Sequence, residues 1–214
     1  SIVLYTGESA TRTVGHGLSA VPNFIIFKSR GGTRHWGVYH TDTVLNMLTV
    51  NRSNAADTGA ATAFGGSTST LPTSSVFTIG DSSETGKSEN YVAYVWHNVD
   101  GYSRFGSYEG NGNANGPFIH LGFRPRMLFI KRTDSAANWQ VRDTARRTFN
   151  VHDVTLNWDS NTTETQNSNH NMDILSNGFK LRTTLGDYNA SGGDYVYGAW
   201  GDVPFKYGNT HING

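Results

Sequence analysis

The segment "PNFIIFKSR" at residues 22–30 recurs as "PRMLFIKRT" at residues 125–133. With the two prolines aligned, Lys28 falls on Lys131 and Trp36 falls on Trp139. Further pairs follow in the same order: "LTVN" (48–51) with "VTLN" (154–157), "SSVFTI" (74–79) with "SNGFKL" (176–181), and "YVAYVW" (91–96) with "YVYGAW" (195–200). Because chance does not supply several matching blocks in one order, the sequence predicts an internal duplication.

The repeated blocks have the character of β-strands. They are short, continuous apolar runs rich in Val, Ile, Phe, Tyr and Trp, which is typical of strands covered on both faces. Clusters of Gly, Asn and Ser separate them, and candidate helix is scarce. The strand pattern therefore predicts an all-β fold, with two sheet-on-sheet units side by side or one composite sandwich. Of these, we predict two tandem homologous β-sandwich units of the jelly-roll or lectin-like kind.

The segment "GNGNANG" at residues 110–116 separates the two copies in this alignment. It has no large apolar side chain to bury, and many of its residues tolerate a positive φ. We therefore predict a first sandwich over 1–109, a linker over 110–116 and a second sandwich over 117–214. The segments "GDSSETGKSEN" (80–90) and "GDYNASGG" (186–193) stand at equivalent places before the last strand of each copy, and both are expected to be hairpin loops.

The repeat also predicts which side chains are buried. The equivalent pairs Trp36/Trp139 and Trp96/Trp200 are expected to lie in the core, because an aromatic residue shared by both copies is more typical of packing than of binding. On the strand that contains Trp36 or Trp139, the opposite face differs between the copies. Such divergent positions either face solvent or have a specialised role, and we expect this face to be solvent-exposed. Its residues are His35, Gly37 and Tyr39 in the first copy and Asn138, Gln140 and Arg142 in the second.

The amino-acid composition limits the classes of partner that the chain is expected to bind. Lys+Arg and Asp+Glu are both 17, so the zero net charge indicates no nucleic-acid partner. Charged residues make up only 16% of the chain, against about 25% in typical domains. Cysteine is absent, and no apolar run is long enough to cross a membrane. The chain opens on Ser1 rather than Met and is therefore expected to be processed or part of a longer protein.

Motifs of known chemistry are not found. The eight histidines form no HExxH pair, and no segment carries the alternating acids of a calcium loop. There is no GxSxG elbow, and the acids lie singly, without the strand pair that a glycosidase would use. We therefore predict no catalytic residue, no metal site and no cofactor.

Several blocks resemble a known family. "VGHGLSAVPNFIIFKSR" (14–30), "GYSRFGSYEGNG" (101–112), "GPFIHLGFRPRMLFIKR" (116–132) and "PFKYGNT" (204–210) are similar to a domain of bacteriophage tail-fibre-like virion proteins, frequent in marine and cyanobacterial phages. In that family the domain commonly closes the polypeptide. The resemblance implies a virion location, on the tail or capsid surface, with a structural or attachment role.

The leading functional hypothesis is a non-enzymatic attachment or receptor-binding module that recognises host cell-surface glycan, present as a homo-oligomer (most often a trimer in such fibres) with other virion proteins. The alternatives are a purely structural capsid-decorating or fibre-shaft protein, and a polysaccharide-depolymerising tailspike domain. Exposed Tyr, Asn and Asp residues in loops are the candidate sugar ligands. They are Tyr102, Tyr108, Asn111, Asn113, Asp187, Tyr188 and Asn189.

Overall fold

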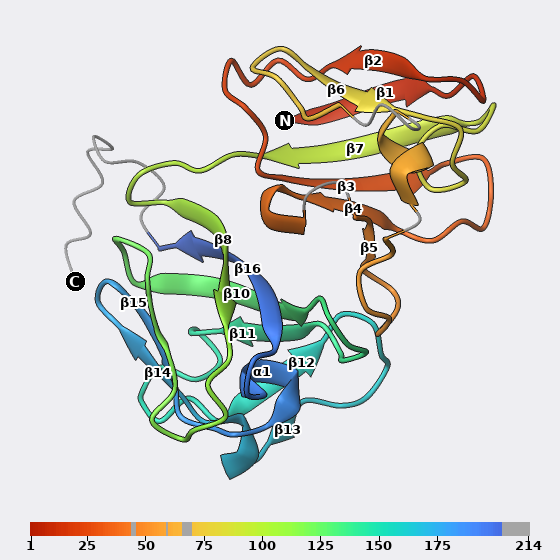
Figure 1. Cartoon of the computed structure of the whole chain (residues 1–214). Coiled ribbons are helices and arrows are strands. Elements are labelled where there is room, and N and C mark those ends of the chain that lie inside the picture. The colour runs from red at the N-terminus through yellow and green to blue at the C-terminus, as the bar shows by residue number, and fades with distance from the viewer. Residues whose placement is uncertain (44–45, 59, 66–69, 203–214) are drawn as a thin grey trace.

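The structure, a computed structural model, describes residues 1–43, 46–58, 60–65 and 70–202 (Figure 1). Strands make up 41% of the structure and helix 7%, and within the described residues the several antiparallel sheets do not close into a barrel, which confirms the predicted all-β class. The "PFKYGNT" motif at 204–210 and the rest of the predicted second unit after residue 202 lie outside the described residues.

The N-terminal part forms a five-stranded antiparallel sheet in the order β1-β7-β3-β4-β5. A two-stranded sheet, β2-β6, covers one of its faces. The strands are β1 (Ile2–Thr6), β2 (Arg12–Gly15), β3 (Phe24–Ser29), β4 (Gly37–His40), β5 (Leu48–Thr49), β6 (Val76–Ile79) and β7 (Asn90–Trp96). The 3₁₀ helices η1 (Thr41–Thr43) and η2 (Ala60–Phe64) lie in the connections. We call this part the N-terminal sandwich.

The C-terminal part forms a six-stranded antiparallel sheet in the order β13-β12-β11-β10-β16-β8, with a three-stranded sheet, β14-β15-β9. Its elements are β8 (Ser103–Glu109), β9 (Phe118–His120), β10 (Pro125–Arg132), β11 (Gln140–Asp143), β12 (Val154–Asn157), β13 (Thr165–Gln166), η4 (Ser168–His170), β14 (Met172–Leu175), β15 (Gly178–Leu181), α1 (Gly186–Asn189) and β16 (Asp194–Gly201). We call this part the C-terminal sandwich.

The two large sheets share one strand order, because β8-β16-β10-β11-β12 repeats β1-β7-β3-β4-β5. Even the register agrees. Tyr5 lies opposite Tyr91 with the rings stacked 5.3 Å apart, and Tyr108 lies opposite Tyr195 with the rings stacked 4.9 Å apart. This shared order agrees with the duplication inferred from the sequence, which stays an interpretation.

The change from one sheet to the other does not coincide with the expected linker. Strand β8 pairs with β16 along its whole length, so residues 103–109 lie in the C-terminal sandwich. The segment 110–116 joins β8 to β9 within that sandwich, and the sheets change between β7 and β8. Composition misled the prediction, since a loop inside a unit needs the same small, turn-forming residues as a linker.

The large sheets pack against each other through a cluster that we call the central layer: Phe24, Val38, Leu48, Phe105, Phe129, Trp139, Val141 and Val196. Alternation along each strand makes this possible. On β3, Ile25 and Phe27 face the β2-β6 sheet, whereas Phe24 faces the central layer. The rings of Phe24 and Phe129 lie 5.0 Å apart across it. The molecule is therefore a stack of four sheets with the central layer in the middle (Figure 1).

The structure corrects part of the burial prediction. Trp139 is fully buried, and its indole N–H donates to the carbonyl oxygen of Thr49 at 2.8 Å, whereas Trp36 is 37% exposed. Trp96 and Trp200 are half-buried and pack against the central layer. Trp36 differs because it lies beyond the covered area, where the Lys28 ammonium is 5.9 Å from its ring centre.

The face expected to be solvent-exposed is instead largely buried. Tyr39 packs in the core of the N-terminal sandwich, and Gln140 and Arg142 are no more than 2% exposed in the C-terminal sandwich. Their polarity therefore does not mark a surface. It marks a buried hydrogen-bond network, which sequence patterns cannot distinguish from a wet strand face.

Replacing Trp139 with Ala is expected to lower the free energy of unfolding by about 3–5 kcal/mol, because it removes a buried ring at the centre of the stack. The equivalent change, Trp36→Ala, is expected to cost about 1 kcal/mol or less, since that ring keeps much of its contact with water. Urea denaturation of both variants measures the difference. Equal losses would contradict the asymmetric packing.

Candidate functional site

The structure brings six of the seven candidate sugar ligands together. They lie in or beside α1 and the 110–116 loop, and they are Tyr108, Asn111, Asn113, Asp187, Tyr188 and Asn189. Tyr102 lies apart, in the turn between β7 and β8. Residues 186–189 form the short helix α1 and not the simple hairpin loop that was expected.

Asn189 holds this region together. The side chain is fully buried, and its oxygen accepts a hydrogen bond from the Asn111 backbone N–H at 2.8 Å. Its amide nitrogen, which carries two N–H donors, lies within hydrogen-bond distance of three acceptors: the Asn111 side-chain oxygen at 3.0 Å, the Asn113 carbonyl at 2.8 Å and the Thr183 carbonyl at 2.8 Å. Asn189 therefore fastens the 110–116 loop to the sandwich, which accounts for its position without a ligand.

Tyr188 belongs to the buried hydrogen-bond network formed by Gln140 and Arg142 of β11. Its hydroxyl accepts from an Arg142 guanidinium nitrogen at 2.7 Å and donates to the Gln140 side-chain oxygen at 2.8 Å. The Gln140 amide donates in turn to Asp187 at 2.8 Å, and burial raises the pKa of that carboxyl. Tyr188 and Asn189 are both inaccessible, whereas Asn111 and Asn113 are exposed and Tyr108 and Asp187 are half-buried, so only these last four members of the group could reach a ligand.

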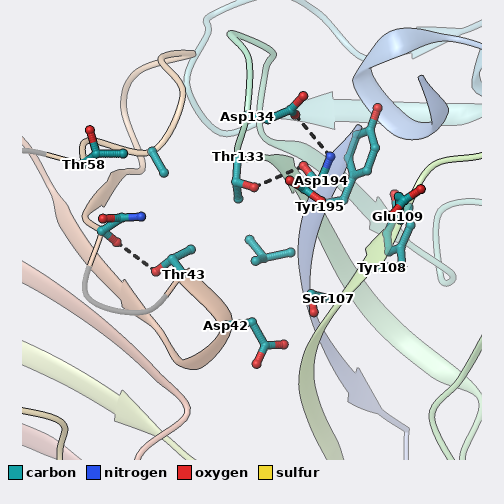
Figure 2. Close-up of a pocket in the computed structure, with 13 residues that line it drawn as sticks. Asp42, Thr43, Thr58, Ser107, Tyr108, Glu109, Thr133, Asp134, Asp194 and Tyr195 are labelled. Carbon is teal, nitrogen blue, oxygen red and sulfur yellow. Dashed lines mark hydrogen bonds between the residues drawn. The ribbon is translucent and has the colours of Figure 1, made fainter. Parts of the chain in front are cut away.

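A cleft between the two sandwiches offers a more open site (Figure 2). Its volume is about 610 Å³. One wall comes from η1 and the segments before and after β5, and the other from β8, β16 and the residues after β10. The lining residues are Asp42, Thr43, Asn46, Ala56 and Thr58 on the first wall, and Ser107, Tyr108, Glu109, Thr133, Asp134, Asp194, Tyr195 and Val196 on the second.

The cleft forms where the central layer ends. On β8, Phe105 is buried in that layer, while Ser107 and Glu109, the next residues on the same strand face, are exposed. On β16 the same change occurs from Val196 to Asp194. Because the inward face turns from apolar to polar along both strands, the sheets lose their packing there and leave room for water or a ligand.

Carboxylates dominate the cleft. Asp134 accepts from two nitrogens of Arg132, at 2.8 Å and 2.9 Å, and this pairing lowers the pKa of Asp134. No hydrogen bond or ion pair from the described part of the chain engages the carboxylates of Asp42, Glu109 or Asp194. Glu109 lies directly opposite Asp194 on neighbouring strands, so these two acids are side by side.

Sequence reasoning missed this pair. Glu109 and Asp194 are 85 residues apart in the chain, and only the pairing of β8 with β16 makes them neighbours. Comparison of the two sequence copies could have singled out these two acids. The equivalent neighbours in the N-terminal sandwich are Thr6 and Asn90, both uncharged, so the acids are particular to one unit.

His40 fixes the first wall of the cleft. It is fully buried at the end of β4, and its Nε2–H donates across the interface to the Tyr197 carbonyl oxygen at 3.1 Å. Its Nδ1 accepts from the Asp42 backbone N–H at 3.1 Å, and the Thr43 hydroxyl donates to the His40 carbonyl at 2.9 Å. Burial lowers the pKa of His40 to about 4, so the neutral ring is the form that holds η1 against β16.

The free energy of unfolding is expected to fall on acidification. The His40 pKa is about 4 in the fold and about 6.5 in an unfolded chain, so its contribution is complete above pH ~6.5 and is lost as the pH falls toward 4. The loss should be about 3 kcal/mol.

Urea denaturation across this pH range measures that loss. Burial also lowers the pKa values of His152 and His170, so wild type must be compared with His40→Gln. In this variant the amide can still donate to Tyr197 but does not titrate. A weaker pH dependence in the variant is expected, and identical pH profiles would contradict the role of His40.

The described residues contain no group of three or more His, Asp or Glu side chains placed to hold a metal ion. No helix among them has the length and apolar character needed to cross a membrane.

Comparison with known proteins gives a family and little else. A family model described as "Domain of unknown function (DUF7483)" matches residues 1–204, so the chain belongs to this family. No curated protein and no solved structure matches the chain.

Proposed function

We propose that this member of the DUF7483 family is a non-enzymatic attachment module on a virion surface, and that it binds host cell-surface glycan in the cleft between its sandwiches. The virion location rests on the resemblance of the "GYSRFGSYEGNG" and "GPFIHLGFRPRMLFIKR" segments to tail-fibre-like proteins. The binding role rests on the chemistry of the cleft.

The observation that carries the binding role is a cleft lined by hydrogen-bonding groups in the size range of ligand sites. Its volume of about 610 Å³ lies within the range of about 300–1,000 Å³ that such sites occupy. The carboxylates of Asp42, Glu109 and Asp194 are acceptors for sugar hydroxyl groups, and charge-assisted hydrogen bonds of this kind are stronger than neutral ones.

The lining also supplies donors and a rigid frame. The Asn46 amide and the hydroxyls of Thr58, Ser107 and Thr133 can complement the two-sided hydrogen bonding of a sugar ring. His40 and the central layer hold the two walls in place, which reduces the entropy lost on binding.

One observation favours a second candidate, polysaccharide cleavage. Retaining glycosidases use two carboxyl groups held about 5–5.5 Å apart. Glu109 and Asp194 form an acid pair at directly opposite positions of neighbouring strands. A glycosidase general acid, however, usually occupies a desolvated pocket. Both acids here are exposed, and we therefore place binding first.

Glycan-array screening of the 214-residue chain tests the proposal. Asp194→Asn combined with Glu109→Gln is expected to weaken binding to array-positive glycans by about 100-fold, the effect of removing two charge-assisted hydrogen bonds of about 1.5 kcal/mol each. Asp81→Asn is the matched control, because Asp81 is an exposed acid outside the cleft, paired with Lys87 at 2.7 Å.

The outcomes separate the hypotheses. Unchanged glycan binding in the double variant would show that the cleft is not the binding site. Absence of any binding would leave a purely structural virion role. Release of reducing ends from host polysaccharide by wild type, lost in Glu109→Gln, would establish the second candidate in place of the first.

A further inference from the structure

Strand β1 is an open edge of the five-stranded sheet. Its inner side pairs with β7: Val95 N–H donates to the Ser1 carbonyl at 2.9 Å, and Gly7 N–H donates to the Glu89 carbonyl at 2.9 Å. In an antiparallel pair, alternate residues direct their backbone groups to opposite sides. The backbone groups of Ile2, Leu4 and Thr6 therefore point away from β7, and no strand of the described part of the chain pairs with them. The Thr6 carbonyl accepts a hydrogen bond from the Arg12 guanidinium at 3.1 Å, which a pairing strand would have to displace.

The same strand exposes two large apolar side chains. Ile2 is 70% exposed and Leu4 is 65% exposed, and both lie on the sheet face that contains the central layer. They continue the apolar surface of the neighbouring strand, since Ile2 lies opposite Tyr94, whose ring stacks on Trp96. Ile2 and Leu4 thus extend the apolar sheet face that carries the central layer.

The C-terminal sandwich provides an internal comparison. Its edge strand β8 occupies the position of β1, with Phe105 equivalent to Ile2 and Ser107 equivalent to Leu4. Phe105 is covered by the N-terminal sandwich and is 3% exposed, and the strand carries Arg104 and Glu109. Charges protect open strand edges from pairing with other chains. Strand β1, with the sequence IVLYT, has no charge, glycine or proline.

We propose that β1 pairs with β1 of a second copy of this chain, antiparallel about a two-fold axis, to join two five-stranded sheets into one continuous sheet. In the register that pairs all three outward residues, Leu4 lies opposite Leu4 of the second copy, and Ile2 lies opposite its Thr6. Because the axis is perpendicular to the sheet, the apolar side chains of both copies lie on one face and cover one another.

A second copy is the occupant that the charges favour. The strand is neutral, and the net charge of the chain is zero, so two copies approach without electrostatic repulsion. A strand is also self-complementary about a two-fold axis, which makes each contact occur twice. The result is a dimer contact, in place of the trimer expected for tail fibres.

Sedimentation velocity of the 214-residue chain over a range of concentrations tests this contact. Wild type is expected to show a monomer–dimer equilibrium. Leu4→Lys places two ammonium groups side by side at the axis and should weaken dimerisation by at least about tenfold. Phe118→Lys is the matched control: Phe118 is a 45% exposed apolar residue on β9, the edge strand of another sheet. This change should leave dimerisation unaltered.

Cysteine cross-linking checks the register independently. The chain has no cysteine, so Leu4→Cys introduces a single thiol at the axis and should give covalent dimers with a short bifunctional maleimide, whereas Phe118→Cys should not. Because Leu4 is exposed, both Leu4 variants should keep the wild-type circular dichroism spectrum. A monomeric wild type at all concentrations, or a Leu4→Lys dimer as stable as wild type, would overturn the proposal.

Discussion

The packing of one apolar sheet face against another is the interaction on which this structure depends. The continuous apolar runs on β3 and β10 bury both faces of each large sheet, so neither sandwich can be complete alone: Phe24 would face water without Phe105 and Phe129. Burying aromatic side chains removes large apolar areas from water and favours one fixed arrangement of the two units. The Trp139 indole reinforces this arrangement with its hydrogen bond to Thr49.

The cleft is a consequence of that packing. Where the inward-facing residues change from Phe105 to Ser107 on β8, the sheets part, and the acids Glu109 and Asp194 come together with no basic partner among the described residues. His40 fastens the opposite wall through the Tyr197 carbonyl. The change from apolar to polar residues along β8 and β16 thus gives the cleft its polar lining, next to the packed layer that keeps it rigid.

Sequence reasoning recovered what depends on local pattern. Runs such as "YVAYVW" predicted the buried strands and the all-β class correctly, because a continuous apolar run needs cover on both faces. It failed where the tertiary arrangement determines the outcome. The 110–116 segment has the composition of a linker but lies within one sandwich, and Trp36 and Trp139 align in the sequence but differ in burial. The Glu109–Asp194 pair could not be predicted, because only the strand register brings the two residues together. The sequence predicts Asn189 and Tyr188 to be loop residues, because burial of polar side chains in a hydrogen-bond network leaves no periodic signal.

Hydrogen–deuterium exchange of the chain with and without host surface polysaccharide tests the central claim most directly, since it locates a contact without assuming one. Glycan bound in the cleft should add protection at residues 41–43, 107–109, 133–134 and 194–196, which line both of its walls. Protection confined to the 110–116 and 186–189 segments would contradict it, because the ligand would then bind the asparagine-rich loops and leave the cleft empty.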